Sequence, residues 1–331
     1  MNPARNQIHT IQAINFGIEI ETIGKDRAEL AAILAAALPG SRVVFEGGYY
    51  NKHAVVLADG RKWILMSDGS LSTHRSAEIV SPICTYSDLD MVQNVVRAAR
   101  AGGARVDASC GIHIHVDATP DSKLGSDPNA IVRLAKLVYQ QEELIIAALG
   151  AERRAAGHYT RPMDPAFVQR LIASRPATVD AVKLAYYGST WTMSDAAHDH
   201  YHHSRYRGLN LHALQRGTVE FRYFAPSLHA GEVKAYIQLC LALAAKAITG
   251  RTAVARKRTF SAATAKYDVR VFLLRLGLIG DEFETCRLHL LKRLAGSASR
   301  KHGTAAPAAG PTVASAPAVA SNIDAILGYV G

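Results

Sequence analysis

Apolar and ionisable residues alternate along three short segments of the chain, a pattern typical of strands with one face in a core. The segments are INFGIEIETI (14–23), CGIHIHVD (110–117) and GTVEFRYF (217–224). Because successive side chains of a strand point to opposite faces, each segment places apolar residues on one face and an ionisable pair on the other. The pattern therefore predicts three strands with a core face and a chemical face.

The chemical faces of these strands complement one another. Strand by strand, their ionisable pairs are Glu19 and Glu21, His113 and His115, and Glu220 and Arg222. If the strands share one sheet, the pairs combine into one polar surface. The short strand AEIVSP (77–82) adds Glu78 and the preceding DGS turn adds Asp68.

Longer segments follow a helical pattern and set the expected fold class. Helices are predicted at 26–38, 86–103, 127–150, 164–174, 176–186, 231–250 and 269–278. A hairpin is predicted at 55–66, around the favoured two-residue turn Asp59-Gly60. Strands and long helices without regular βαβ alternation indicate an α+β fold with an antiparallel sheet.

Composition changes this picture little. The 331 residues are 49% hydrophobic, enough for a sizeable core, and the net charge is +10. The chain has no apolar run of about 20 residues and no signal-peptide pattern. Its four cysteines form no CxxC pair, which favours free thiols in a cytoplasmic protein. The expected domain spans 1–295, followed by a disordered Ala/Ser/Pro-rich linker (296–321) and a short apolar segment (322–331).

Carboxylates beside an imidazole suit a hard divalent cation such as Mg²⁺ or Mn²⁺, whereas an arginine suits a planar oxyanion. Alternation by itself is also typical of any half-solvated antiparallel strand, and each single motif is weak. Three strands with complementary chemistry together favour a site.

The order of the motifs resembles a known family. FGIEIE, DGSL, AEIVSP, CGIHIHV, RGLNL and GTVEFRYF follow one another as in the amidoligase family, one of the glutamine synthetase-like carboxylate–amine ligases. The resemblance covers roughly residues 14 to 250. It implies a curved antiparallel sheet of the glutamine synthetase-like catalytic type, with helices packed on one face. ATP and two Mg²⁺ or Mn²⁺ ions would bind on the other face.

The resemblance also implies residue roles. The expected metal ligands are Glu19, Glu21, Glu78, His113 and Glu220. Arg222, Arg207 (or else Arg205) and His115 match residues that face the nucleotide and its phosphates, and Asp68 matches a contact to the amine. The implied reaction is ATP-dependent amide-bond formation between a small-molecule or peptide carboxylate and an amine, through an acyl phosphate.

Other interpretations stay open at this point. HDHYHH (198–203) is rich in histidine. It is compatible with a zinc hydrolase or metal-binding module, with a lid over the site, or with incidental surface histidines. A guanidino-kinase-like phosphotransferase shares the broader fold. A non-catalytic protein could bind nucleic acid through the basic segments 251–260 and 287–301, although neither shows the interleaving of basic and aromatic residues that single-strand binders use for stacking. Neither the substrates nor a homo-oligomeric state follow from the sequence.

Overall fold

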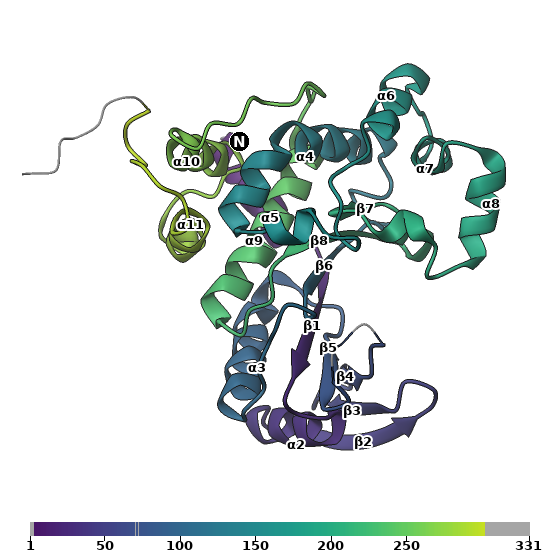
Figure 1. Cartoon of the computed structure of the whole chain (residues 1–331), viewed down its shortest axis with the longest axis vertical. Helices are drawn as coiled ribbons and strands as arrows, with labels where there is room; N and C mark the ends of the chain where they lie inside the picture. The colour runs from purple at the N-terminus through teal and green to yellow at the C-terminus, as the bar shows by residue number, and fades with distance from the viewer. Residues whose placement is uncertain (1–2, 70, 72, 302–331) are drawn as a thin grey trace, which may run out of the picture.

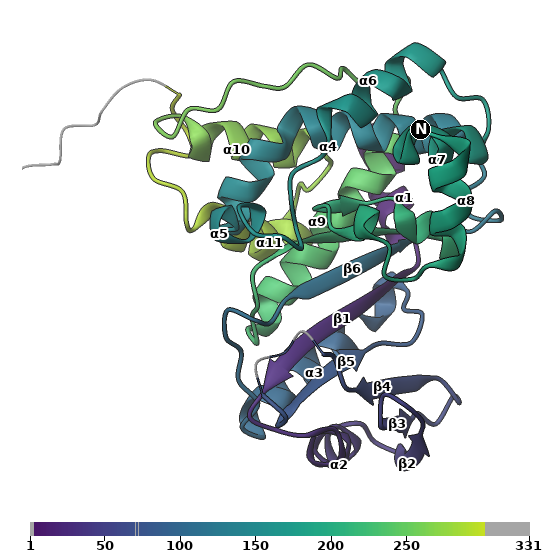
Figure 2. The same ribbon diagram turned by 45° about the vertical axis from the view of Figure 1, so that its right-hand side comes forward.

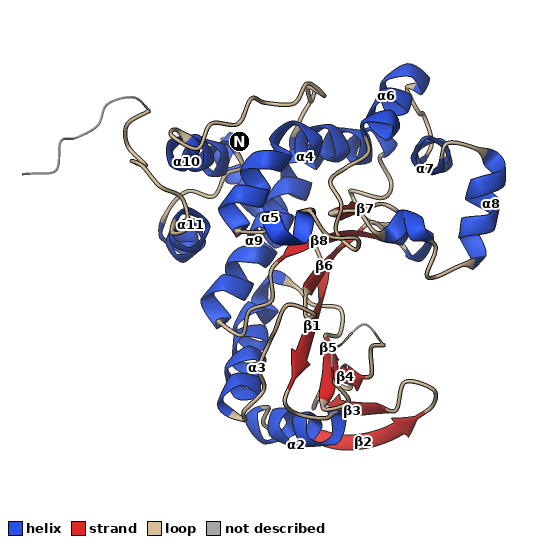
Figure 3. Ribbon diagram, viewed as in Figure 1, coloured by secondary structure: helices blue, strands red, loops and turns tan. Residues whose placement is uncertain are grey.

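The described residues form an α+β fold built on one eight-stranded antiparallel sheet (Figures 1 and 3). The structure is a computed structural model that describes residues 3–69, 71 and 73–301. The strand order is β2-β3-β4-β5-β1-β6-β8-β7. The strands are β1 (Phe16–Ile23), β2 (Arg42–Gly47), β3 (Lys52–Val56), β4 (Lys62–Met66), β5 (Ser76–Val80), β6 (Ile112–Asp117), β7 (Leu209–Asn210) and β8 (Thr218–Phe224). This confirms the predicted fold class: the sheet is curved, unclosed and antiparallel.

Helices pack on the apolar face of the sheet and above its β8 end (Figures 1 and 2). The α-helices are α1 (Pro3–Gln12), α2 (Arg27–Ala37), α3 (Leu89–Ala101), α4 (Pro128–Leu149), α5 (Glu152–Ala155), α6 (Pro165–Ser174), α7 (Val179–Tyr187), α8 (Thr190–His198), α9 (Ala230–Thr249), α10 (Ala265–Arg275) and α11 (Glu284–Leu291). Four 3₁₀ turns complete the described part of the chain: η1 (Tyr86–Asp88), η2 (His203–Arg205), η3 (His212–Arg216) and η4 (Asp281–Phe283).

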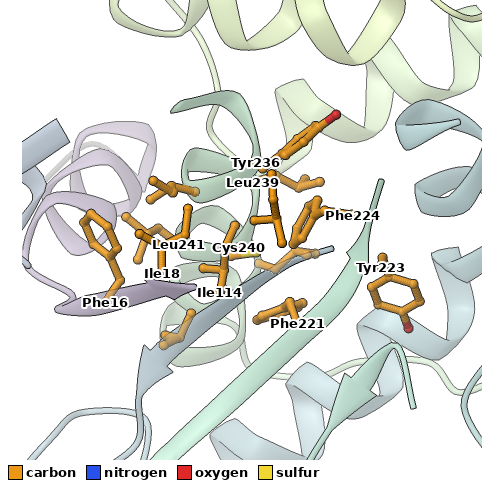
Figure 4. Close-up of a cluster of buried hydrophobic side chains, with 14 of the residues drawn as sticks. Phe16, Ile18, Ile114, Phe221, Tyr223, Phe224, Tyr236, Leu239, Cys240 and Leu241 are labelled. Atoms are coloured by element: carbon orange, nitrogen blue, oxygen red, sulfur yellow. The ribbon is translucent and has the colours of Figure 1, made fainter. Parts of the chain in front are cut away.

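The core lies between α9 and strands β1, β6 and β8 (Figure 4). Ile18 and Ile114 are adjacent in register, and both are buried beneath α9. At the end of β8 the predicted alternation breaks, because β8 has one residue more than β6 between two aligned pairs. Strict alternation along GTVEFRYF would put Tyr223 on the apolar face. Because of the extra residue, Phe224 takes that place beside α9 and stacks on Tyr236.

Local sequence signals fix several element ends. Asp26 and Glu29 form a reciprocal capping box at the start of α2. Asp127 caps α4, and Gly150 ends it with φ of +60°, a conformation that favours glycine. The predicted hairpin forms between β3 and β4. The backbone N–H of Leu57 donates to the carbonyl oxygen of Arg61, which leaves a loop of three residues (58–60) instead of the predicted two, with Gly60 at φ of +86°.

Two expectations concern other parts of the chain. The predicted linker (296–321) lies outside the described residues from position 302 onward, and the apolar segment (322–331) lies outside them entirely. Among the described helices, none combines the length and hydrophobicity required to cross a membrane.

Candidate active site

The register of the sheet brings the predicted ionisable residues together on one face. β1 lies between β5 and β6, and β6 lies between β1 and β8. The directly opposed pairs are Glu21 with Glu78, Glu19 with His113, and His115 with Glu220. Opposed residues in an antiparallel pair have Cβ atoms about 5 Å apart, so the side chains form one continuous cluster.

Glu19 links the two histidines of the CGIHIHV strand. One of its carboxylate oxygens lies 3.0 Å from Nδ1 of His113 and the other lies 3.2 Å from Nε2 of His115. Nδ1 of His115 is 3.2 Å from the hydroxyl of Thr218. The two imidazoles are therefore held in different settings: His113 lies within the carboxylate cluster, and His115 lies at its side.

Two groups of side chains in this cluster have the spacing of cation sites. Glu19, His113 and Glu220 form one group, and Glu21, Glu78 and His113 form the other. Within each group, one potential ligand atom from every residue lies within 4.8 Å of the others. The two groups share His113, and together they contain the five residues predicted to bind metal. Oxygen-rich sets of this kind fit Mg²⁺ or Mn²⁺.

Glu21 and Glu78 lie in the more strongly negative part of the cluster. Burial raises the pKa of Glu78 well above its usual value, and the negative charges of Glu19, Asp68 and Glu21 raise it further. Burial also raises the pKa of Glu21, although the charge of His113 opposes that shift. Two such carboxylates repel each other when both are ionised. A cation bound between them stabilises the ionised form of both.

Glu220 has the opposite environment. Arg222 donates a hydrogen bond from Nη1 to Oε1 of Glu220, and Asn210 donates one from Nδ2 to Oε2 over 2.5 Å. Burial alone would raise the pKa of Glu220, but the charges of Arg222 and the imidazoles outweigh it and lower the pKa to about 2. The Glu220 carboxylate is therefore ionised and fixed in position before any ligand binds.

A cavity of about 1730 Å³ lies over this face of the sheet. It is larger than the roughly 300–1,000 Å³ of a typical small-molecule site, so it has room for more than one substrate. The five predicted metal ligands line it, together with His115, Arg222 and Asp68.

Arg207 is the one predicted site residue that the structure does not place in this cavity. Its Nη1 donates to the carbonyl oxygen of Pro162, and the side chain lines a separate, smaller pocket. Arg205, the alternative, does line the large cavity. The two arginines differ because the 3₁₀ turn η2 ends at Arg205, and the chain then turns toward β7.

The histidine-rich segment contributes to the cavity without forming a metal site in the described part of the chain. His200 and Tyr201 line the cavity, whereas His202 and His203 line the smaller pocket. Neither of the two groups with cation-site spacing includes a histidine of 198–203. The hydroxyl of Tyr201 lies 2.5 Å from that of Tyr50, in the loop between β2 and β3. This contact connects two loops from opposite ends of the sheet at the rim of the cavity.

Sequence patterns missed two residues of the site. Asn210, which holds Glu220, belongs to the RGLNL motif and could have been found from its position. Arg154 also lines the cavity, but it comes from the short helix α5, and no alternation or motif marks it.

Comparison with known proteins agrees with the motifs. Residues 12–244 match the model of a family described as "Putative amidoligase enzyme", which confirms the resemblance predicted from the sequence. The search of curated proteins found no match. Among solved structures, the comparison found a bifunctional glutathione synthetase from Pasteurella multocida, with a TM-score of 0.40 and 14% identity over 88% of this chain. The alignment covers 48% of that protein, so this chain spans about half its length.

Proposed function

Because the chain belongs to the amidoligase family, we propose that it is an ATP-dependent ligase that joins a carboxylate to an amine. The proposed reaction transfers the γ-phosphate of ATP to the carboxylate, and the amine then attacks the resulting acyl phosphate. The substrates are a small-molecule or peptide carboxylate and an amine. The observation that carries this proposal is the pair of ligand groups that share His113 at the floor of a cavity large enough for several substrates.

The chain's own residues supply the charge balance that such a reaction needs. Glu19, His113 and Glu220 would hold one divalent cation. Glu21 and Glu78, which lie beside His113, would hold the other, because a neutral imidazole has a single lone pair to offer. When bound, the cations would offset the charge of the phosphates and orient them. Arg222 lies beside the first group, where its guanidinium stabilises negative charge on a reacting oxyanion.

The remaining cavity residues suit the other steps. Arg205, rather than Arg207, is the arginine before the NL motif that is positioned to contact phosphate from this cavity. His115, which lines the same cavity beside Glu19, would face the same phosphates. Asp68 lies among the carboxylates, where it can accept the proton that the attacking ammonium group releases. The Tyr50–Tyr201 contact at the rim would limit the entry of water that could hydrolyse the acyl phosphate.

The test is a panel of amino acids, peptides and amines assayed for ADP formation with Mg²⁺. A ligase forms ADP only when a carboxylate and an amine are both present. Glu21→Ala and His113→Ala should each abolish turnover with little loss of fold, because both residues face the cavity and not the core. Full activity in either variant would contradict the metal assignment.

The panel also separates the remaining alternatives. A guanidino-kinase-like phosphotransferase would form ADP with a single acceptor. A zinc hydrolase would act without ATP, and a nucleic-acid-binding protein would show strongly salt-dependent binding that ignores ATP.

A further inference from the structure

The glycine of the CGIHIHV motif makes room for an arginine. Gly111 precedes β6 on the face that carries His113, and a Cβ atom at this position would lie 2.5 Å from Nη2 of Arg154 and 2.9 Å from its Nη1. Such distances are far below van der Waals contact, so a side chain at 111 and the present position of Arg154 exclude each other. The guanidinium of Arg154 therefore lies directly over Gly111, where the charge of Glu21 acts on it.

Arg154 forms no ion pair in the described part of the chain. Its Nη1 donates to the carbonyl oxygen of Cys110 over 2.7 Å, and its Nε is buried with no hydrogen-bond partner among the described residues. The described ion pairs, which extend to 4.0 Å, do not include Arg154. Burial lowers the pKa of Arg154, an effect that the charge of Glu21 opposes. A half-buried charge with an unused donor is costly unless an anion joins it.

Arg222 has the same unused donor. Only 5% of the residue is exposed, and its Nη1 pairs with Glu220, but its Nε is buried without a partner among the described residues. The two arginines lie close enough for the charge of Arg222 to act on Arg154, and both line the same cavity. Two neighbouring guanidinium groups, each with an Nε–H that has no partner among the described residues, suit the binding of a planar oxyanion between them.

We propose that Arg154 and Arg222 form a subsite that binds the carboxylate of the substrate to be activated, with Gly111 as the position that admits Arg154. The identity of the oxyanion rests on the proposed ligase function, since a phosphate has related chemistry. The subsite lies beside Glu21 and His113, so a carboxylate bound there is held next to the predicted cations. Arg154 is a substrate-binding residue in this arrangement, and Arg222 serves both the carboxylate and Glu220.

The first test measures binding and needs no knowledge of the substrates. The thermal stability of the full chain is recorded with acetate, inorganic phosphate or chloride at equal ionic strength. Acetate should stabilise the wild-type protein more than chloride does, and Arg154→Met and Gly111→Ala should each remove that difference. Arg97→Ala is the matched control, because Arg97 is exposed on α3 and its side chain hydrogen-bonds to Asn94, away from the cavity lining.

Each outcome of this test decides the proposal. An acetate effect that survives in Arg154→Met, or that is absent from the wild-type protein, would overturn the subsite. Stabilisation by phosphate but not by acetate would assign the arginines to the nucleotide and overturn the carboxylate assignment. If no pair of substrates supports ADP formation but the acetate effect depends on Arg154, the subsite stands and only the ligase proposal fails.

A second test applies once the panel has identified a substrate pair. Arg154→Lys retains the charge but loses the planar fork, so it should raise KM for the carboxylate ten- to a hundredfold, the range expected for charge-assisted hydrogen bonds. KM for ATP should stay within about twofold, since the γ-phosphate contacts are assigned to other residues. A rise in KM for ATP alone would overturn the assignment.

Discussion

Glu78 and Glu220 face the same cavity, but their surroundings affect ionisation in opposite directions. Glu78 is buried among other carboxylates, whereas Glu220 is paired with Arg222 and Asn210. Without bound cations, Glu78→Gln should therefore stabilise the fold at neutral pH by about 0.5–2 kcal/mol, because it removes a repelled charge. Glu220→Gln should destabilise the fold by about 3 kcal/mol, because it leaves Arg222 buried without its anion. Denaturant titrations of the two variants in chelator measure both effects, and a shift of the same sign in both would contradict the electrostatic account.

The same residues predict how stability depends on pH. Glu21 and Glu78 have raised pKa values, so above the usual carboxyl pKa of 4.5 the folded chain holds protons that the unfolded chain releases. His115 also has a raised pKa, because the charges of Glu19 and Glu220 outweigh its burial. Each of these three groups stabilises the fold while it is protonated. That stabilisation is lost as pH rises through the group's pKa in the folded protein. The lowered pKa values of Glu19 and Glu220 act only below about 4.5, outside this range.

Divalent cations should reverse the loss of stability at higher pH. Mg²⁺ replaces the protons on Glu21 and Glu78, so its stabilising effect should grow as pH rises from 5 to 8. The measurement is the melting temperature with and without about 10 mM MgCl₂, a concentration chosen to exceed the weak affinity of a metal site without bound nucleotide. An effect of Mg²⁺ that is equal at all pH values, or larger at pH 5, would show that these carboxylates are not its ligands.

At the scale of elements, glycines determine how closely strands and neighbouring chains approach. Gly208, in the RGLNL motif, accepts a hydrogen bond from the backbone of Arg222, and a Cβ atom at 208 would lie 2.0 Å from the ring of Tyr223. That ring cannot move away easily, because its hydroxyl donates to the buried carboxylate of Glu142 over 2.8 Å. The motif therefore needs glycine at this position for packing, independently of chemistry.

Gly208→Ala should destabilise the protein by about 2 kcal/mol or more through overpacking at the junction of β7 and β8. Gly17→Ala is a suitable control in β1, because a Cβ atom there would meet no described atom closer than 3.8 Å. Its effect should stay within about 0.5 kcal/mol. Equal losses in the two variants, measured by denaturant unfolding, would contradict the packing argument.

The elements also show how far sequence could predict the site. A period of two fixes which face of a strand a residue occupies, so Glu19, Glu21 and His113 were predictable as one surface once their strands were recognised. Arg154 was not predictable, because its helix is about forty residues from β6 and reaches Gly111 only through tertiary folding. The choice between Arg205 and Arg207 depended on where a 3₁₀ turn ends, which no pattern indicates.

At the scale of the whole molecule, the sheet separates packing from chemistry. α9 and its neighbours cover the apolar face (Figure 2). The charged face of β1, β5, β6 and β8 is left open to one large cavity. The loops that carry Tyr50 and Tyr201 meet at its rim, although they belong to opposite ends of the sheet. Antiparallel pairing makes this arrangement possible, because each strand alternates between the two roles.

The central proposal, that a carboxylate is activated by phosphoryl transfer from ATP, has a direct test. A substrate pair from the panel is used with ¹⁸O in the carboxylate, and the phosphate released is analysed by mass spectrometry. Attack of the carboxylate on the γ-phosphate transfers one ¹⁸O atom to each phosphate formed together with amide product. Phosphate without ¹⁸O, in a reaction that still forms the amide, would contradict the acyl-phosphate mechanism.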